Sequence, residues 1–378
     1  MRVLFVSHRL NLSGASIHNL SLGKQLTKLG HDVAIVSRDS AEGTPLGKEV
    51  FLNNGFSVYK TELPTNPASI LFDIKKYKTK FLDIIEEFKP DIIHVQAPTL
   101  TPFCVLALRN KKIPVVSTYN IEEISRSKIF GARLVNTFAP SLMGSCALAI
   151  SQEMKDVLIS DLGFSSDRVQ SFPNSVDLNK FRYPSAEERA TARSKFGVRD
   201  SDFVVSIAAI LDERKGHEYA INAVKKLRSK GLDVMLLCGG RDAGNKEHLE
   251  NLIVELGLSE RVKLLGNVNS QELYWASDLS LLPSLKEGFG LVIIEAMLSG
   301  VVVARTRTAG FKDQIVEGVN GFGIDTGSVD SITSLVKYVL QNKDNMADIK
   351  HRGYTHVVEN FSVEKMADAT LSIYKDYI

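Results

Sequence analysis

Cysteine is scarce in this sequence. Its 378 residues include three cysteines, Cys104, Cys146 and Cys238, and each lies in an apolar stretch. Their scattered positions give neither a disulfide framework nor the spacing of a structural metal site. We therefore expect three buried thiols in a protein of a reducing compartment.

Long hydrophobic segments are missing as well. The longest stretch without a charged residue, residues 134–152, contains Asn136, Pro140, Gly144 and several serines. Such a segment is too polar and too interrupted to form a transmembrane helix. Residues 1–7 indicate a first strand rather than a signal peptide. We therefore expect a cytoplasmic protein.

Neither sign of charge dominates. The chain has 46 Lys and Arg residues against 44 Asp and Glu residues, a net charge of +2. This balance excludes a strongly basic nucleic-acid-binding protein, and we expect no nucleic-acid partner. Residues 1–173 carry 20 basic and 16 acidic residues. Their net charge of +4 is a slight indication of an anionic partner for the first half.

Short apolar runs rich in β-branched residues alternate with helix-length segments along the whole chain. This alternation predicts βα units and parallel sheets, and ten strands suit two sheets better than one. The expected strands are residues 3–6, 33–36, 92–95, 115–118, 147–150, 204–208, 234–238, 262–264, 278–282 and 301–304. A dinucleotide-dependent oxidoreductase would also have parallel sheets. No Gly-x-Gly-x-x-Gly follows the first strand, however, which disfavours that alternative.

Two glutamates eight positions apart, Glu287 and Glu295, are the most informative residues. They flank a Gly-Phe-Gly turn between an expected strand and an apolar, helix-forming stretch. The amides of Phe289, Gly290 and Leu291 at the helix start are suited to an anion such as a diphosphate. Carboxylates repel phosphate, so both glutamates are expected to accept hydrogen bonds from hydroxyls. A ligand with phosphates in the middle and hydroxyls on both sides is a nucleotide sugar.

Residues 283–297 resemble the E-x7-E region of retaining GT-B glycosyltransferases of family four. The resemblance implies an α/β fold of two Rossmann-like domains, whose parallel sheets face each other across a cleft. It implies an acceptor domain over residues 1–173 and a nucleotide-sugar donor domain over 174–361. A terminal helix, 362–378, would cross back onto the first domain. The segment 172–177 resembles the interdomain linker of the family, with Ser175 in place of a glycine.

The same resemblance assigns roles to single residues. It implies that Glu295 binds the nucleotide ribose and that Glu287 binds hydroxyls of the donor sugar. Lys215 precedes a glycine at an expected helix start and would neutralise the leaving diphosphate. Gly14 resembles the second glycine of a loop against the donor phosphates, with Ser13 replacing the first. A simple helix cap would explain this Ser-Gly turn nearly as well.

Two positions depart from the family pattern. Asn120 stands where the family often has the histidine of Thr-x-His. Asparagine can form hydrogen bonds, but it carries no charge near neutral pH. Ala209 stands where the family usually has an arginine, six residues before Lys215. One cation of the expected leaving-group clamp is therefore missing.

A loop after the strand 301–304 offers two replacement cations. We expect Arg305 or Arg307 to contact phosphate, with Arg214 pointing away. Arginine suits this role because its planar guanidinium can hold two phosphate oxygens. A structural role for the two loop arginines is an equal alternative.

His94, the acidic residues and a group of lysines indicate function less clearly. His94 ends a strand and resembles the first histidine of the family's His-x-His, but a core or hinge role is favoured over catalysis. No Asp, Glu or His cluster has metal-ligand spacing, so we expect no metal.

Four lysines lie in residues 75–80. The resemblance suggests peripheral membrane contact through them, while a solvated helix face is the favoured alternative.

The sequence therefore predicts a retaining, metal-independent hexosyltransferase with Lys215, Glu287 and Asn120 at its catalytic centre. It would use a nucleotide-diphosphate sugar, by resemblance a UDP-sugar, and no other cofactor. Its acceptor would be a hydroxyl of a glycan or lipid-linked molecule, in polysaccharide or glycoconjugate synthesis at or near the inner face of the membrane. The main alternative is a catalytically weak homologue that binds nucleotide sugar as a subunit of an assembly.

Overall fold

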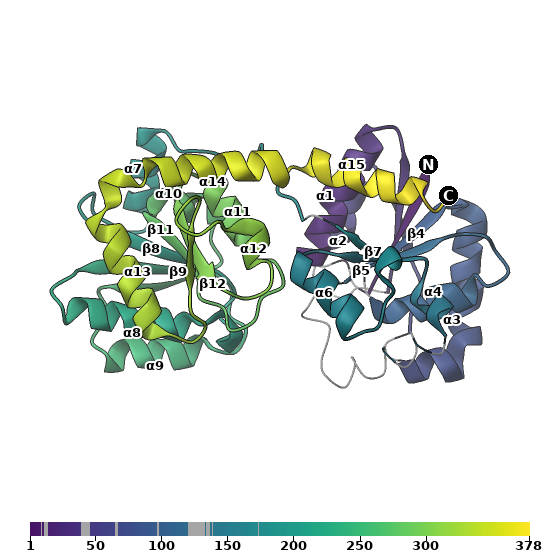
Figure 1. The fold of residues 1–378 in the computed structure, drawn as a ribbon, viewed down its shortest axis with the longest axis horizontal. Coiled ribbons are helices and arrows are strands. Elements are labelled where there is room, and N and C mark those ends of the chain that lie inside the picture. The colour runs from purple at the N-terminus through teal and green to yellow at the C-terminus, as the bar shows by residue number, and fades with distance from the viewer. Residues whose placement is uncertain are drawn as a thin grey trace. The chain divides into compact units, whose positions relative to one another are not determined.

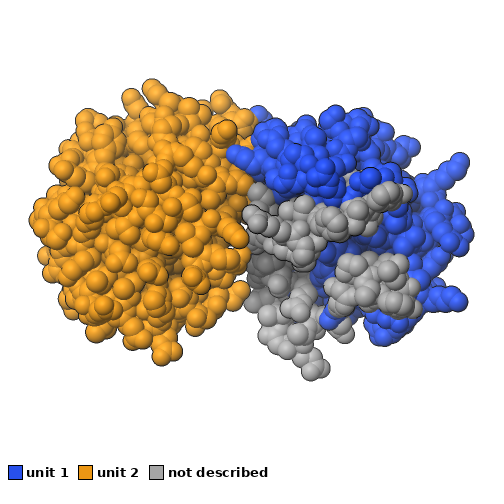
Figure 2. Space-filling model, turned by 60° about the horizontal axis from the view of Figure 1, so that its bottom comes forward, with its two compact units in different colours: residues 1–175, 363–378 blue, residues 176–362 orange. Residues whose placement is uncertain are grey.

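The computed structural model describes two compact units. It describes residues 1–8, 10, 14–38, 46–64, 67–96, 98–119, 133, 137, 139–172 and 174–378. Unit 1 comprises Met1–Ser175 and Val363–Ile378, and unit 2 comprises Val176–Ser362 (Figures 1 and 2). The sequence places the two boundaries at 173/174 and 361/362, within two residues of these divisions.

Unit 1 contains a seven-stranded sheet in the order β3-β2-β1-β4-β5-β6-β7, and neighbouring strands pair in parallel. Its strands are β1 Arg2–Ser7, β2 Asp32–Ser37, β3 Ser57–Lys60, β4 Ile92–Val95, β5 Val115–Tyr119, β6 Cys146–Ala149 and β7 Val169–Ser171. Its described α-helices are α1 Gly14–Lys28, α2 Leu46–Leu52, α3 Pro67–Phe88, α4 Thr101–Ala107, α6 Gln152–Ser160 and α15 Val363–Lys375.

Unit 2 contains a six-stranded parallel sheet in the order β10-β9-β8-β11-β12-β13. Its strands are β8 Phe203–Ala208, β9 Val234–Gly239, β10 Val262–Gly266, β11 Leu279–Leu282, β12 Val302–Thr306 and β13 Phe322–Ile324. Its helices are α7 Ala186–Lys195, α8 His217–Arg228, α9 Lys246–Glu255, α10 Ser270–Ala276, α11 Leu291–Leu298, α12 Phe311–Gln314, α13 Val329–Gln341 and α14 Ala347–Asn360, with a 3₁₀ turn, η5, at Glu213–Lys215.

Both sheets have the strand order of a Rossmann fold. In each, the first three strands extend to one side and the later strands to the other. The direction of the connections therefore reverses between β1 and β4 in unit 1 and between β8 and β11 in unit 2. Ligands of open α/β sheets bind outside the carboxyl ends of the strands at this switch point.

The ten strands expected from sequence are all present, and the described residues form three further strands that were missed. The missed strands, β3, β7 and β13, each lie at the edge of a sheet. Each has only three or four residues, and β3 has no fully buried position. An edge strand is covered less than a central one, so it does not need the continuous apolar run that marked the others.

Helices on both faces explain why the central strands of unit 2 are apolar throughout. Every residue of β8, β9, β11 and β12 is buried. Figure 1 shows α8, α9 and α13 on one side of this sheet and α7, α10 and α11 on the other. Residues of β8, β9, α8 and α13 share one hydrophobic core. This core holds the carboxyl ends of the strands, and hence the loops that follow them, in fixed positions.

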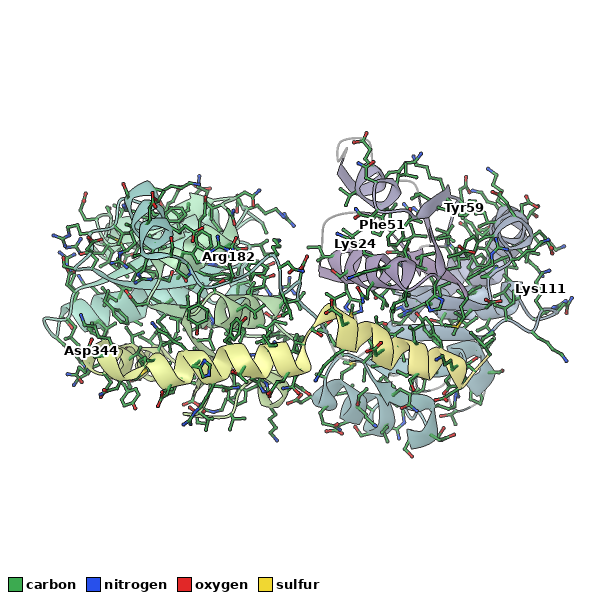
Figure 3. All side chains as sticks on the ribbon, turned by 90° about the horizontal axis from the view of Figure 1, so that it is seen from above. Lys24, Phe51, Tyr59, Lys111, Arg182 and Asp344 are labelled. Atoms are coloured by element: carbon green, nitrogen blue, oxygen red, sulfur yellow. The ribbon has the colours of Figure 1, made fainter. Side chains whose placement is uncertain are left out.

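The C-terminal helix α15 belongs to unit 1 although it follows unit 2 in the chain. It packs against α1, as Figure 3 shows for the yellow helix beside the one that carries Lys24. The Tyr374 hydroxyl of α15 lies 2.6 Å from His94 Nδ1, and His94 Nε2 lies 2.7 Å from Thr118 Oγ1. Burial lowers the pKa of His94 to about 3. His94 is thus a neutral core residue that connects two strands with α15, the role favoured from sequence.

Two further expectations concern cysteine and the membrane. Cys104, Cys146 and Cys238 are free and buried, as the sequence indicated. In the described parts of the chain, no helix has both the length and the apolar character needed to cross a bilayer.

Candidate functional site

Three of the predicted donor-site residues of unit 2 lie at or beyond the carboxyl ends of three neighbouring strands. Lys215 follows β8, Glu287 follows β11, and Arg305 lies at the end of β12, and these strands are adjacent in the order β8-β11-β12. Because the strands are parallel, their carboxyl ends share one edge of the sheet. The first two loops border the switch point, so the sequence and the topology indicate the same location.

A glycine allows the first two loops to approach each other closely. Gly216 has a φ of +70°, and a Cβ at this position would lie 2.1 Å from the carbonyl oxygen of Pro283. The Leu285 amide donates a hydrogen bond of 2.7 Å to the Arg214 carbonyl, which connects the same loops. Only glycine fits both the left-handed backbone and this distance. The approach brings Lys215 beside Glu287.

Lys215 and Glu287 form an ion pair. Lys215 Nζ lies 2.9 Å from Glu287 Oε2, and the two side chains are 14% and 9% exposed. Ser284 Oγ donates to the same carboxylate oxygen at 3.3 Å, and the Gly288 amide donates to Oε1 at 3.2 Å. Three donors therefore fix the Glu287 carboxylate, and both charges stay near the surface where a ligand can reach them.

The helix α11 begins with amides that have no internal acceptor. Gly290 is its N-cap, with φ +77° and ψ +66°, and the helix starts at Leu291. In the part of the chain that the structure describes, the amides of Phe289, Gly290 and Leu291 donate no hydrogen bond. The positive end of the helix dipole lies at the same place. Free amides at a helix start form an anion site.

Arg305 and Gln314 hold the carbonyl groups of this turn. Arg305 Nη1 donates to the Phe289 carbonyl and to Gln314 Oε1, while Gln314 Nε2 donates to the Gly290 carbonyl at 3.2 Å. In a trans peptide the carbonyl and the next N–H point in opposite directions, and no described peptide is cis. The amides of Gly290 and Leu291 therefore point away from Arg305 and Gln314.

Direct phosphate contact by Arg305 is contradicted by its burial. Its side chain is 0% exposed, and it also donates to the Ala309 carbonyl at 2.6 Å and to Thr308 Oγ1 at 3.2 Å. The sequence ended the strand at residue 304, but β12 extends to Thr306 and so includes Arg305. The guanidinium consequently points into the structure beneath the turn. The alternative of a structural role is correct for this arginine.

Arg307 and Arg214 both have acidic partners. Arg307 lies 2.9 Å from carboxylate oxygens of Glu317 and Asp325, and its side chain is 46% exposed. Arg214 lies 3.0 Å from Asp212. Phosphate contact by Arg307 stays a prediction, since a ligand would have to compete with two carboxylates. Ala209 follows β8 directly and supplies no charge.

Glu295 lies on α11, one turn beyond the helix start. Tyr274 Oη donates to its Oε2 at 3.1 Å, and Oε1 has no donor in the described chain. Burial raises the pKa of Glu295, while nearby Lys180 and the Tyr274 hydrogen bond lower it. The free oxygen is available to a ligand hydroxyl. The turn that contains Glu287 and the helix that contains Glu295 thus flank the free amides.

Comparison with known protein families identifies the family of this chain. The sequence model described as Glycosyltransferase Family 4 matches residues 12–180, and the one described as Glycosyl transferases group 1 matches residues 188–356. The chain is a group 1, family-four glycosyltransferase. This membership confirms the family and the GT-B class predicted from the E-x7-E region, and it does not favour an oxidoreductase.

Relatives of this glycosyltransferase span its whole length. An uncharacterized glycosyltransferase of Methanocaldococcus jannaschii is 27% identical and covers 96% of this chain and 94% of its own. N-acetyl-alpha-D-glucosaminyl L-malate synthase of Bacillus anthracis is 24% identical, covering 97% and 95%. The crystal structure of Anabaena HepE in complex with UDP and glucose has a TM-score of 0.82 at 22% identity, covering 100% of both chains. The similarity to the HepE structure establishes the fold of this chain.

Two predicted site residues of the glycosyltransferase, Gly14 and Asn120, fall in the part of the sequence that belongs to unit 1. Gly14 opens α1 after β1, as expected, whereas Asn120 and Ser13 lie outside the described residues. In the described chain, no group of three or more His, Cys, Asp or Glu side chains is arranged to hold a metal.

His217 was not predicted from the sequence. This residue starts α8 directly after Gly216, is 1% exposed, and has no hydrogen-bond partner for either ring nitrogen in the described chain. Burial, followed by the charge of Lys215, lowers its pKa to about 4. A histidine after Lys-Gly resembles an ordinary helix-start residue, so only the structure reveals a neutral imidazole behind the lysine.

Proposed function

We propose that this glycosyltransferase binds a nucleotide-diphosphate sugar on unit 2 and transfers the sugar with retention to a hydroxyl acceptor. The observation that supports this best is the row of three free amides beside the Lys215–Glu287 pair. The amides and Lys215 would hold the diphosphate, Glu287 the sugar hydroxyls, and Glu295 the ribose. Each role matches the charge and hydrogen-bonding capacity of its group.

The proposed donor is a UDP-sugar. Anabaena HepE, a structural neighbour, was solved with UDP and glucose, which makes uridine the first base to test. A thermal-shift screen of UDP, ADP, GDP and their glucose conjugates tests this choice, because a ligand of the native state raises stability. We expect the largest shift with UDP compounds. No shift with any nucleotide would contradict donor binding itself.

The proposed mechanism keeps the acceptor on the same face of the sugar as the leaving diphosphate. The bond from the anomeric carbon to the phosphate oxygen breaks, the acceptor oxygen bonds to that carbon, and the departing phosphate oxygen takes the acceptor proton. Lys215 and the free amides stabilise the charge that develops on phosphate. No histidine base is needed, so Asn120 is compatible with activity. The anomeric configuration of the product, measured by NMR, tests retention.

Metal independence follows from the same assignment. Lys215 and the amides of residues 289–291 would supply the positive potential that a divalent metal supplies in other enzymes. Transfer measured in excess chelator should equal transfer without it. Activity lost in chelator and regained with magnesium or manganese would contradict this part of the proposal.

A catalytically weak homologue is the second candidate, because Asn120 and Ala209 depart from the family pattern. Slow hydrolysis of the donor, with water as acceptor, separates the two candidates without knowledge of the acceptor. Hydrolysis that is lost in Glu287→Ala supports the enzyme. Tight nucleotide-sugar binding with no hydrolysis or transfer supports the weak homologue.

The acceptor is proposed to be a glycan or lipid-linked molecule handled at the cytoplasmic side of a membrane. Lys75, Lys76, Lys78 and Lys80 on α3 are the residues that would contact the membrane. Three buried free thiols suit a reducing compartment. Co-sedimentation with anionic vesicles, with and without these lysines, tests the membrane contact.

A further inference from the structure

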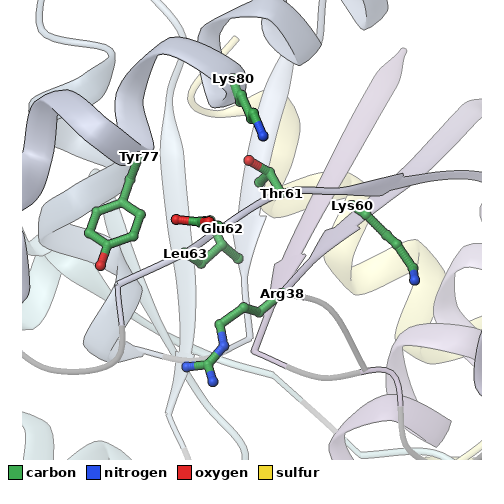
Figure 4. Close-up of a pocket in the computed structure, with 7 residues that line it drawn as sticks. All are labelled: Arg38, Lys60, Thr61, Glu62, Leu63, Tyr77 and Lys80. Carbon is green, nitrogen blue, oxygen red and sulfur yellow. The ribbon is translucent and has the colours of Figure 1, made fainter. Parts of the chain in front are cut away.

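Unit 1 has a cavity that the proposed donor site does not use. It measures about 540 Å³ and lies at the carboxyl ends of β2 and β3, beside α3 (Figure 4). Its volume is within the range of small-molecule sites. The Thr61 amide donates to the Ser37 carbonyl at 3.1 Å. This bond continues the pairing of β2 with β3 and places Thr61 next to Arg38.

Four groups that line the cavity can donate hydrogen bonds and have no partner in the described chain. Arg38 is half-buried and forms neither a hydrogen bond nor an ion pair, and the same holds for the Tyr77 hydroxyl and the Lys80 ammonium group. The Thr61 hydroxyl is buried, at 6% exposure, without a hydrogen bond. A buried hydroxyl left unpaired costs free energy. A ligand oxygen at this place would remove that cost.

The side chains are arranged around one space. Arg38, Thr61, Tyr77 and Lys80 all line this one pocket. In Figure 4 Lys80 ends near Thr61, while the Tyr77 ring and the Arg38 guanidinium lie on opposite sides of the segment that carries Thr61. Lys60 points away from them in the same view. The residue that follows β2 and the helix α3 thus supply the cations.

The acidic residue at the cavity has a lysine partner on the surface. Glu62 lies 2.8 Å from Lys76, which is on the next turn of α3 from Lys80. The hydrogen bond and charge of Lys76 lower the pKa of Glu62, and Lys80 adds to this effect. With Glu62 paired, Arg38 and Lys80 leave the cavity net positive. The whole first half of the sequence is also net positive.

The chemistry of these groups selects an anion. Arginine and lysine only donate hydrogen bonds, whereas a neutral sugar needs acceptors as well as donors. A phosphate or carboxylate offers acceptor oxygens only, and its bonds to charged donors are the strong ones. We propose that this cavity binds a phosphate or carboxylate group of the acceptor. That the ligand is the acceptor rests on the proposed function, while the anion site itself does not.

Isothermal titration of the full chain with glucose 6-phosphate, glucuronate and glucose tests the proposal. The nucleotide that gives the largest thermal shift is present at saturation, so that the donor phosphate site is filled. We expect both anions to bind at least tenfold more tightly than glucose at about 0.15 M salt, where exposed charges are screened. Equal affinity for the anions and for glucose would overturn the proposal.

Substitutions assign the binding to the cavity. Arg38→Gln and Lys80→Gln should each weaken glucose 6-phosphate binding roughly tenfold, the effect of one lost charge-assisted hydrogen bond. The control Lys75→Gln removes the same charge from an exposed position of α3 outside the cavity. An equal loss in this control would show a general charge effect and overturn the assignment.

A variant of Thr61 distinguishes a ligand role from a structural one. Thr61→Val removes an unpaired buried hydroxyl at nearly constant volume, so the melting temperature should stay the same or rise. Anion affinity should nevertheless fall by about threefold or more, because one donor to the ligand is lost. A lower melting temperature with unchanged affinity would give Thr61 a structural role and contradict the proposal.

The source of the anion is identified with vesicles. Binding to phosphatidylglycerol vesicles but not phosphatidylcholine vesicles, lost in Arg38→Gln and kept in Lys24→Gln, which changes an exposed lysine of α1 outside the cavity, would assign the group to a lipid. Binding of the free sugar phosphate alone would assign it to a soluble acceptor. Nucleotide affinity should be unchanged in every cavity variant. If the wild type binds no nucleotide, the proposed function is contradicted. If it binds nucleotide but does not prefer anions to glucose, only the cavity proposal is contradicted.

Discussion

Lys215 Nζ lies 2.9 Å from Glu287 Oε2, so the cation expected to hold the donor diphosphate and the carboxylate expected to hold the sugar form one ion pair. A ligand that binds here must share or replace this interaction. The pair therefore couples the two halves of the donor, and removing either partner should affect the other.

Glu287→Ala should lower transfer strongly while nucleoside-diphosphate affinity stays the same or rises. Lys215 loses its protein partner and becomes free for phosphate, whereas the sugar hydroxyls lose their acceptor. Titration with UDP and a transfer or donor-hydrolysis assay measure the two effects. Glu287→Gln, which keeps the hydrogen bonds without the charge, is the matched control. An equal loss of affinity for the bare nucleotide would contradict this division of roles.

Lys215→Met should weaken nucleotide binding and also destabilise unit 2. The Glu287 carboxylate, 9% exposed, would lose its cation, at a cost of roughly 1–3 kcal/mol in the free energy of unfolding. The double variant Lys215→Met with Glu287→Gln should regain most of this stability without regaining activity. Chemical denaturation of Lys215→Met, Glu287→Gln and the double variant measures the free energy of unfolding. Additive losses in the double variant would show that the pair is not coupled.

The sequence predicted the parts of the fold and site that depend on local pattern. β-Branched runs located ten strands, and the Gly-Phe-Gly turn located the start of α11 within the switch-point loops. The edge strands β3, β7 and β13 were missed, because short strands at sheet edges carry little apolar pattern.

Sequence patterns did not predict the direction in which these side chains point. Arg305 was expected on a loop, but β12 continues through it, with Leu282 and Gly323 as its strand neighbours. The pairing of Lys215 with Glu287 and the burial of His217 also depend on tertiary contacts over long separations. A charged or polar residue in a motif does not indicate whether its nearest partner is a ligand or the protein.

Glu295→Ala should weaken both the nucleotide and its sugar conjugate. Its Oε1 has no donor in the described chain, and a hydrogen bond from a ribose hydroxyl to this carboxylate would be lost. The expected cost is roughly 1.5–3 kcal/mol for each ligand. Calorimetric titration of both ligands measures it, and Glu295→Gln should lose less because it keeps an acceptor oxygen. Unchanged affinity for both in a folded variant would refute the ribose assignment.

The stability of unit 1 should fall as the pH decreases from 6.5 toward 4. Burial lowers the pKa of His94 to about 3 and that of His18 to about 4, from an ordinary value of 6.5. Below pH 6.5 the unfolded chain therefore binds protons that the folded chain does not. Each histidine should remove unfolding free energy at a rate that approaches about 1.4 kcal/mol per pH unit well below pH 6.5, and the stability is fully present well above pH 6.5.

Denaturant unfolding of wild type and His94→Gln at pH 5.0, 5.5, 6.0 and 6.5 tests this pH dependence. The variant is expected to be less stable, since the contacts with Tyr374 and Thr118 change. The informative quantity is the mean slope of unfolding free energy against pH over this range, which should be smaller by about 1 kcal/mol per pH unit. An unchanged slope would show that His94 does not titrate differently in the two states.

Arg305 should act by holding the anion-binding turn in place. Its guanidinium and the Gln314 amide fix the carbonyls of Phe289 and Gly290, and so aim the next amides at the proposed phosphate site. Arg305→Met should release this turn, reduce the number of aligned amides and lower kcat more than nucleotide affinity. The charge to be stabilised grows in the transition state, so misaligned donors cost most there. Gln314→Leu should give a weaker effect of the same kind, because it removes the amide that holds Gly290.

Steady-state kinetics and nucleotide titration of Arg305→Met, Arg305→Lys and Arg307→Ala separate positioning from direct contact. Arg305→Lys keeps a charge but cannot bond all the carbonyls at once, so it should restore little activity. Amide hydrogen exchange should be faster in residues 288–292 of both Arg305 variants. Arg307→Ala should change kcat little if its guanidinium remains with Glu317 and Asp325. A large loss of kcat in Arg307→Ala, with normal turnover and exchange in Arg305→Met, would instead make Arg307 the second phosphate cation and remove the positioning role of Arg305.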